Sequence, residues 1–214
     1  MTAEKVLEIA RGEIGVKESP YGSNKVKYNT EFYGSPVAGT AYPWCVAFVW
    51  WVFKQAGASS LFYGGKKTAS CTVLNTYHQG QGQGISGGYR PGDIIFFNFS
   101  GGRSTDHVGI CESWDGATIT TIDGNTGTGN EANGGAVMRR SRSKRYIVAA
   151  YRPAYEQEEE KMEMDNSPSA WAKEAVEWAQ EQGLLKGDQY GNLQLHKEMT
   201  REEMCVFLYR FSNN

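Results

Sequence analysis

A cysteine that follows a short turn is the residue in this sequence best placed to act as a nucleophile. Cys45 comes soon after Pro43 and opens an apolar run that ends at Gly57, and this pattern predicts a buried helix with the cysteine in its first turn. The N–H groups and the dipole at the start of a helix favour a thiolate, and the same N–H groups can stabilise an oxyanion. We therefore expect a cysteine nucleophile, against the alternative of a buried structural cysteine.

His107 is the candidate for the general base. It follows a polar loop and begins an expected strand, so its side chain can face a cleft. Residues 118–123 form the next expected strand, and a turn at residues 114–116 joins the two as a hairpin. This pairing brings Asp123 or Asn125 near His107, and either could orient the imidazole as the third member of a triad. The alternatives are a structural histidine and a simple Asp-Gly turn.

Helices come first along the chain and strands follow, which is the order of an α+β fold. A helix is expected over residues 2–11, and another one begins at Cys45. Loops rich in glycine and polar residues are expected over residues 15–43 and 78–89. Short apolar runs bounded by turn residues predict four strands, at residues 94–97, 107–111, 118–123 and 146–151.

Length and composition fit one sizeable core and a small second module. The chain has 214 residues, 40% of them hydrophobic, and no apolar run approaches the roughly 20 residues that span a membrane. The first residues mix acids with apolar side chains and contain no cleavage site, so we expect no signal peptide. The protein is therefore expected to be made in the cytoplasm. The four cysteines show no C-x-x-C pair and no zinc-ligand spacing, and Cys71 and Cys111 are interpreted as structural.

The charge distribution separates a basic body from an acidic tail. Residues 1–153 carry a net charge of +5 and residues 154–214 a net charge of −7. A mildly basic body suits an anionic partner such as a bacterial wall, and no motif for nucleic acid is present. Residues 156–165 hold six acids and one lysine, so residues 154–166 are predicted to be a solvated linker, against the alternative of a docked charged helix.

A small helical module is expected over residues 167–214. Ser167 is expected to cap its first helix, and Gly183 to end that helix. Thr200 and Glu203 form a capping box for a second helix. So short a module buries little by itself, so packing on the body or self-association is expected. The second helix is predicted to have a buried stripe of Met204, Phe207, Leu208 and Phe211.

Four short motifs follow one another in the body. They read YPWCVAFV at residues 42–49, RPGDIIFF at 90–97, DHVGI at 106–110 and IDGNT at 122–126. Together they resemble the motifs of CHAP domains, the cysteine- and histidine-dependent amidohydrolase/peptidase domains of phage lysins and bacterial autolysins. The resemblance covers about residues 1–153 and implies a papain-like α+β fold.

The resemblance also implies roles for single residues. Cys45 takes the position of the nucleophile and His107 that of the base. Asp123 holds the acidic position, where relatives often have glutamate, and Asn125 matches the asparagine that follows it. The choice between Asp123 and Asn125 as the main partner of His107 stays open at this point.

The residues before the nucleophile bear on substrate and metal binding. Tyr42 and Trp44 are close to Cys45 in sequence and are expected to line the substrate cleft. Some CHAP domains bind calcium through an acidic Asp-x-Asp loop before the cysteine. Residues 27–31 (KYNTE) stand in that stretch here and lack such a cluster, so neither a metal ion nor another cofactor is expected.

The tail has a resemblance of its own. The segments WAKEAV at residues 171–176, GLLKG at 183–187 and MTREE at 199–203 are similar to one S-layer homology repeat. Such repeats bind secondary wall polymers, usually as sets of three, so a single repeat favours either oligomerisation or a structural unit. Trp171 and Arg201 are the wall-binding candidates, against the alternatives of a core tryptophan and a solvated cap.

These features together indicate an endolysin-like cysteine hydrolase. It is expected to cleave amide bonds in the peptide part of peptidoglycan, as an N-acetylmuramoyl-L-alanine amidase or an endopeptidase, after release through a holin pore. The expected partners are peptidoglycan, secondary wall polymers and further copies of the chain through the C-terminal module. The alternatives are a non-catalytic cell-wall-binding protein and a cysteine amidase that acts on another substrate.

Overall fold

The computed structural model describes residues 1–156, 164–189 and 191–213. The chain divides into two compact units, residues 1–157 and 158–214. The acidic linker predicted at residues 154–166 spans this division, and its residues 157–163 lie outside the described part. Among the described residues, no helix is both long and apolar enough to cross a membrane.

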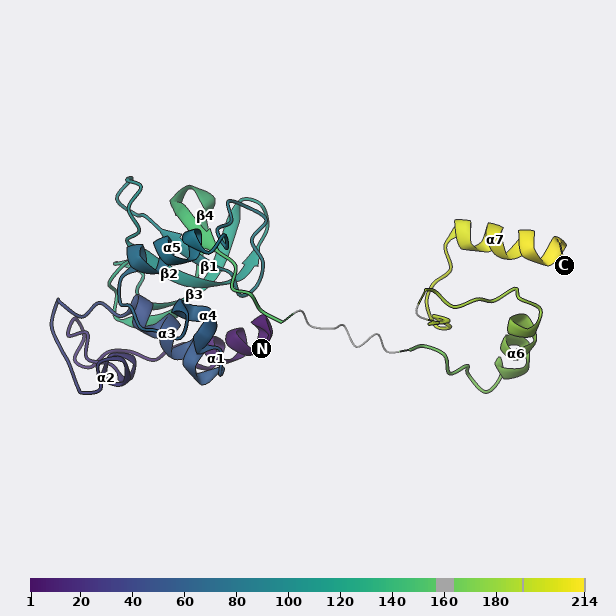
Figure 1. Ribbon diagram of the computed structural model, residues 1–214, viewed down its shortest axis with the longest axis horizontal. Coiled ribbons are helices and arrows are strands. Elements are labelled where there is room, and N and C mark those ends of the chain that lie inside the picture. Colours follow the sequence, from purple (N-terminus) through teal and green to yellow (C-terminus); the bar gives the residue numbers. More distant parts are fainter. Residues whose placement is uncertain (157–163, 190, 214) are drawn as a thin grey trace. The chain divides into compact units, whose positions relative to one another are not determined.

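A five-stranded antiparallel sheet with the strand order β4-β3-β2-β1-β5 is the frame of the first unit (Figure 1). All four predicted strands are present, and the turn at Gly116 joins two of them as the expected hairpin. β4 was not predicted, because its sequence AVMRRSRS is dominated by polar residues and β3 is the strand that it pairs with. The strands are β1 (Ile94–Phe97), β2 (His107–Trp114), β3 (Thr118–Thr126), β4 (Ala136–Ser143) and β5 (Ile147–Tyr151), with a short 3-10 helix (Lys144–Tyr146) before β5.

Five α-helices are formed by the described residues of the first unit. The first begins one residue later than expected, where the Thr2 side chain accepts a hydrogen bond from the Lys5 backbone N–H. The second helix lies within a stretch that was expected to be a loop, and the last residues of the fifth helix overlap the other expected loop, since their short, mixed sequences have little helical periodicity. The helices are α1 (Ala3–Gly12), α2 (Lys27–Tyr33), α3 (Cys45–Gln55), α4 (Ser59–Tyr63) and α5 (Cys71–Gly80).

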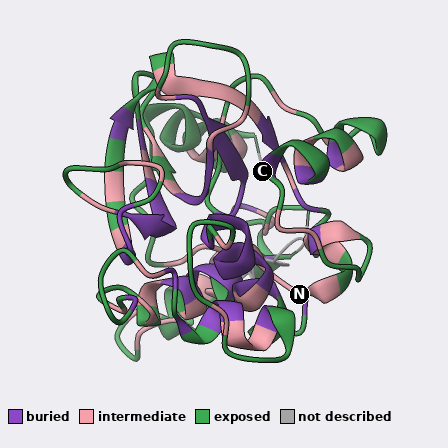
Figure 2. Ribbon diagram, turned by 90° about the vertical axis from the view of Figure 1, so that its left-hand side faces the viewer, coloured by how far each residue is buried: buried purple, intermediate pink, exposed green. Residues whose placement is uncertain are grey.

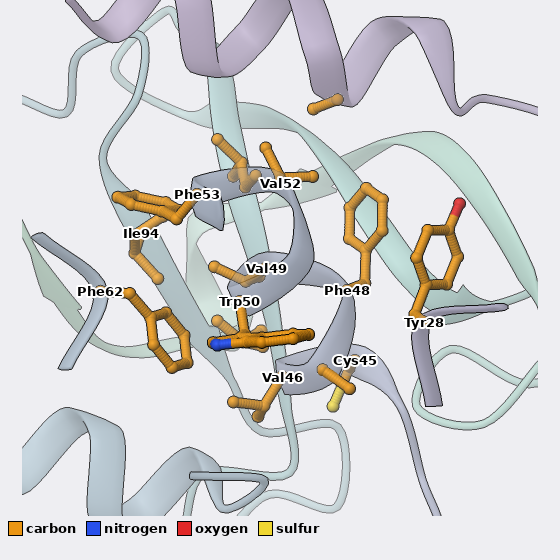
Figure 3. Packing of buried hydrophobic residues seen from close by; sticks show 14 of the residues in the cluster. Tyr28, Cys45, Val46, Phe48, Val49, Trp50, Val52, Phe53, Phe62 and Ile94 are labelled. Carbon is orange, nitrogen blue, oxygen red and sulfur yellow. The ribbon is translucent and has the colours of Figure 1, made fainter. Parts of the chain in front are cut away.

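Helix α3 is the centre of the core. Nearly all of its residues are buried, because it packs on the sheet through β2 and β3 and on the sides against other helices. Figure 3 shows Cys45 at the start of this helix, followed by Val46 and Val49 among the buried side chains. A second, smaller apolar cluster, which includes Phe97 and Ile119, covers the other face of the sheet. Buried residues accordingly follow the strands, and exposed residues cover the loops (Figure 2).

The approach of α3 to the sheet depends on a glycine. At Gly124 in β3, an added Cβ atom would lie 2.4 Å from Cβ of Phe48. A contact this short is not compatible with a side chain at position 124, since both atoms belong to packed elements. The expected α+β, papain-like arrangement is thus confirmed in its main feature, a helix that carries Cys45 and lies directly on an antiparallel sheet that carries His107.

The described residues of the second unit form two helices, α6 (Lys173–Glu181) and α7 (Arg201–Ser212). The capping box of Thr200 and Glu203 at the start of α7 is confirmed. The prediction of Ser167 as the first cap is wrong, because the residue before α6 is Ala172 and it makes no side-chain cap hydrogen bond within the described part of the chain. Helix α6 therefore begins five residues later than the Ser-Pro signal indicated.

The stripe on α7 is not buried. Met204, Leu208 and Phe211 are about half exposed or more, and Phe207 is only partly covered. The prediction of a buried stripe is therefore wrong for this chain by itself. The physical reason is that two short helices and their loops offer too little apolar surface to enclose a core.

Candidate active site

Cys45 lies where the first turn of α3 meets the sheet. It is only 5% exposed. The residue before it, Trp44, makes no side-chain cap hydrogen bond among the described residues, so the first N–H groups of the helix are left for a bound anion. Another cysteine lies beside it, because Cys71 opens α5 and the two Sγ atoms are 3.9 Å apart.

The surroundings of Cys45 favour its thiolate. A hydrogen bond from the Cys71 thiol, opposed by burial and assisted by the neighbouring imidazole of His107 and its charge, lowers the pKa of Cys45 well below its ordinary value. The same hydrogen bond, together with burial, raises the pKa of Cys71. Cys45 is therefore the thiolate of the pair and Cys71 the thiol that donates to it.

His107 is fully buried at the start of β2 and contacts the acidic residue expected from the sequence. Its Nε2 atom lies 3.1 Å from Oδ2 of Asp123 in β3. Its Nδ1 atom has no hydrogen-bond partner among the described residues, which leaves this nitrogen for Cys45 and for a substrate. One ring nitrogen is thus oriented by Asp123 and the other is available for proton transfer.

The hydrogen bonds of the Asn125 side chain go to residues other than His107. Its Nδ2 donates to Oδ1 of Asn133 over 2.8 Å, and its Oδ1 accepts from the Gly135 N–H over 3.3 Å. Asn125 has a φ of 59°, in the left-handed region, within an irregular stretch of the pairing between β3 and β4. The structure therefore brings Asp123 to His107 and turns Asn125 into the loop that follows β3.

His107 and Asp123 stabilise each other as ions. Burial opposes a charge on His107, but the hydrogen bond to Asp123 and the interaction with Cys45 raise its pKa from 6.5 to about 9. Burial likewise opposes the charge on Asp123, but the positive charge of Arg142 and the hydrogen bond from His107 hold the pKa of the carboxyl below 3.8. At neutral pH the site is thus arranged as a thiolate, an imidazolium and a carboxylate.

Arg142 is a site residue that the sequence did not reveal. It is 6% exposed, and its Nη1 donates to Oδ2 of Asp123 over 2.7 Å. Its guanidinium also lies over the rings of Phe97 and Phe99, at 4.9 and 5.2 Å from their centroids. Arg142 therefore holds the same carboxylate oxygen that binds His107. Its further partners are Thr121 Oγ1, Thr126 Oγ1 and Glu131 Oε2, at 3.2, 3.3 and 2.8 Å.

The other oxygen of Asp123 explains a glycine in the histidine motif. Oδ1 of Asp123 has no hydrogen-bond partner in the described part of the chain. An added Cβ atom at Gly109 would lie 2.0 Å from it. Gly109 therefore leaves the space that the carboxylate occupies beside the second strand of the sheet.

Comparison with known families divides the chain in the same way. Residues 37–125 match the family model described as CHAP domain, and residues 164–205 match that described as S-layer homology domain. The chain contains a CHAP domain and an S-layer homology domain. The first match includes Cys45, His107 and Asp123 but ends before Arg142.

Solved structures give a more distant similarity. A structure titled "The crystal structure of Ly7917" has 20% sequence identity and a TM-score of 0.43, with 72% of this chain and 63% of that protein covered. A second, "The crystal structure of Ly7917 with the hydrolyzing product of MDP", has 18% identity and a TM-score of 0.43, with 71% and 63% covered. The chain thus spans less than two thirds of the length of that protein. No curated protein sequence matches the chain.

The two aromatic residues expected to line the cleft of the CHAP domain differ in placement. Tyr42 is partly exposed and packs edge-on against Tyr33. Trp44 is fully buried, stacks on Tyr28 and donates its indole N–H to Glu18 over 3.4 Å. Trp44 is therefore a core residue that cannot contact a substrate, and Tyr42 is the remaining candidate of the two.

The stretch that stands before the nucleophile forms part of helix α2. Its one acidic residue, Glu31, accepts hydrogen bonds from Trp51 and Lys54, both over 2.6 Å. Within the described residues, no group of three or more His, Cys, Asp or Glu side chains is placed to hold a metal ion.

The S-layer homology domain presents its candidates to solvent. Trp171 is 89% exposed, so it is not the core residue that the alternative interpretation required. Arg201 is exposed at the start of α7. A groove of about 560 Å³ lies between α7 and the loop before it, and its lining includes Leu184, Lys186, Leu195, Met199, Phe207 and Arg210.

Proposed function

We propose that this chain is a cysteine-dependent hydrolase of amide bonds in the peptide part of peptidoglycan. The observation that carries the proposal is the arrangement of Cys45, His107 and Asp123 within a CHAP domain. Cys45 begins a helix, His107 leaves one ring nitrogen open, and Asp123 binds the other at 3.1 Å. Nucleophile, proton carrier and orienting acid are thereby supplied by three neighbouring elements.

The reaction begins from the thiolate–imidazolium pair. The Cys45 thiolate attacks the carbonyl carbon of the amide, and the N–H groups at the start of α3 stabilise the oxyanion. His107 donates its proton to the leaving amine, which departs as a thioester forms on Cys45. His107 then takes a proton from water, the hydroxide attacks the thioester, and the acid is released. Asp123 keeps the imidazole oriented and stabilises its positive charge throughout.

The C-terminal unit supports a role at the wall. Repeats of the S-layer homology family bind wall polymers, and residues 164–205 match the model of that family. The exposed Trp171 offers an aromatic face for a sugar ring. We therefore propose that this unit holds the enzyme on secondary wall polymers while the CHAP domain cleaves. Release through a holin pore, as for phage endolysins, belongs to the same proposal.

Incubation of the full chain with purified cell walls tests the proposal. Mass spectrometry of the soluble products identifies the bond, because an N-acetylmuramoyl-L-alanine amidase frees the amino group of L-alanine and leaves glycan without peptide. An endopeptidase instead frees amino groups within the stem or the cross-bridge. Cys45→Ala is the control, and it is expected to retain the fold, since the cysteine is replaced by a smaller apolar residue, and to release no fragments.

The outcome also decides between the alternatives. If Cys45→Ala releases as many fragments as the wild type, Cys45 is not the nucleophile and the proposal is wrong. If neither protein releases fragments but both sediment with the walls, the chain is a wall-binding protein. If a soluble amide is cleaved in a Cys45-dependent way while walls are not, the substrate class is wrong but the mechanism stands.

A further inference from the structure

Two cysteine side chains meet at the candidate site, and the proposed hydrolysis uses only one of them. The Sγ atoms of Cys45 and Cys71 lie 3.9 Å apart, each at the first residue of a helix. Both side chains are nearly buried, with 5% and 8% of their surfaces exposed. A small molecule that reaches Cys45 therefore meets two sulfur atoms side by side.

We propose that Cys45 and Cys71 form an oxidative modification site, in which a small hydroperoxide oxidises Cys45 and Cys71 closes a disulfide with it. The inference rests on the proposed function only for its effect on activity, because the disulfide occupies the nucleophile. The disulfide itself is a property of the two thiols, whatever the enzyme cleaves.

The reaction balances without another reactant. The Cys45 thiolate attacks an oxygen of the hydroperoxide, the O–O bond breaks, and Cys45 becomes a sulfenic acid while water or an alcohol leaves. The Cys71 sulfur then attacks that of Cys45, the S–O bond breaks, and a disulfide and water form. The two thiols lose two electrons and two protons in all, and the hydroperoxide accepts them.

The two cysteines are suited to different steps. The pKa of Cys45 is lowered and that of Cys71 is raised, so the thiolate that reacts first with the hydroperoxide belongs to Cys45. Once Cys45 is a sulfenic acid, it no longer carries the negative charge that keeps the proton on Cys71. Loss of this charge lowers the pKa of Cys71 again, which favours its action as the resolving thiol.

Formation of the bond requires the two sulfur atoms to move together. The sulfur atoms must approach from 3.9 Å to about 2.0 Å. Each sulfur is attached through one rotatable bond at Cβ, so rotation of either side chain moves its sulfur while the helix backbone stays in place. The disulfide formed in this way is reducible by thiols, whereas a sulfinic acid on Cys45 would not be.

Among the described residues, Cys111 is a buried cysteine without a neighbouring thiol or a lowered pKa, and it serves as a comparison. It is fully buried in β2, its Sγ faces the carbonyl oxygen of Ser113 at 3.7 Å, and burial raises its pKa to about 12. A neutral thiol in an apolar cluster reacts slowly with hydroperoxides. The oxidation is therefore expected at Cys45 and Cys71 and not at Cys111.

The test uses the reduced full chain treated with a slight excess of hydrogen peroxide. Digestion without a reductant, followed by mass spectrometry, is expected to show one linked peptide pair that joins Cys45 to Cys71 and is lighter by two hydrogens. Wall hydrolysis is expected to fall in parallel with the linkage and to return after treatment with dithiothreitol. Mass spectrometry detects the disulfide directly. The experiment therefore tests disulfide formation even if the chain does not hydrolyse walls.

Cys71→Ser separates the resolving step from hydrolysis, since the hydroxyl still donates a hydrogen bond but cannot form a disulfide. Compared with its own reduced form, this variant is expected to lose activity to peroxide without recovery by dithiothreitol, and to carry sulfinic acid on Cys45. Cys205→Ser, at an exposed position in the other unit, is the matched control and should behave as the wild type. Sulfinic acid on Cys45 of the wild type with Cys71 still a free thiol, or a linkage between other cysteines, overturns the proposal.

Discussion

Replacing Arg142 with methionine removes a buried positive charge and keeps an unbranched side chain in its place. In the wild type, the guanidinium donates to Asp123 over 2.7 Å and to Glu131 over 2.8 Å. Without it, Asp123 keeps His107 as a charged neighbour, and Glu131 keeps Arg140. The variant therefore tests whether Arg142 stabilises the ionised carboxylate that orients His107.

The magnitude follows from the burial of the pair. Removing one partner of a buried ion pair typically costs about 3–5 kcal/mol, because the other charge is left without compensation. Asp123 retains a partner and Glu131 is partly exposed, so the lower end, about 3 kcal/mol, applies here. For a unit of this size each kcal/mol lowers Tm by about 2–4 °C, which gives a decrease of about 6–12 °C.

The pH dependence identifies the interaction as ionic. The pKa of Asp123 is depressed in the folded protein, so its contribution to stability is present above its unfolded value and is lost as the pH falls through the folded value. In Arg142→Met the pKa of Asp123 rises and this contribution shrinks. The difference in the free energy of unfolding between wild type and variant is therefore largest at neutral pH and decreases toward about pH 3.

Urea unfolding followed by tryptophan fluorescence, at neutral and at acidic pH, measures these differences. Arg139→Met is the matched control, since Arg139 lies in the same strand and pairs with Glu112 over 2.9 Å at the surface. The control is expected to change stability little, because exposed ion pairs are screened by solvent. A loss in Arg142→Met that is equal at both pH values, or no larger than that of the control, would show that the reasoning is wrong.

Three further predictions concern the site and the second unit. Gly109→Ala places a Cβ atom where Asp123 Oδ1 lies, so kcat/KM for wall hydrolysis should fall about a hundredfold; activity within twofold of wild type contradicts this. Iodoacetamide at pH 6 should label Cys45 before the exposed Cys205, because the pKa of Cys45 is lowered; peptide mass spectrometry that finds the reverse order contradicts a thiolate. Trp171→Ala should weaken sedimentation with purified walls about two- to tenfold without changing hydrolysis of soluble wall peptides; unchanged sedimentation excludes Trp171 from wall binding.

The sequence predicted the elements that carry the chemistry but not the details of their pairing. Continuing the register of β2 and β3 from Ile110 opposite Ile122 would place His107 opposite Asn125. The observed partner is Asp123, because Asn125 adopts a left-handed φ next to an irregularity in the pairing with β4. No pattern in the sequence predicts such an irregularity. The choice between Asp123 and Asn125 as the partner of His107 therefore required the three-dimensional structure.

Arg142 and Cys71 were missed for different reasons. Arg142 belongs to a polar run that is typical of a solvated segment, and only the pairing of β4 with β3 brings it to Asp123. Cys71 begins a helix of mixed sequence, CTVLNTYHQG, and its partner lies 26 positions earlier in the chain. Contacts between residues so far apart depend on tertiary packing, which neither periodicity nor motif spacing encodes.

The position of the candidate site in the sheet has a consequence for how the enzyme responds to heat. His107 and Asp123 stand on neighbouring strands, and Cys45 begins the most deeply buried helix, so none of the three is carried by a loop of its own. Packed central strands and helices open only when the whole unit unfolds, whereas mobile loops and the chain termini open earlier. Inactivation and global unfolding should therefore follow the same temperature curve, and the paired backbone amides of β2 and β3 should exchange with deuterium as slowly as those of the core.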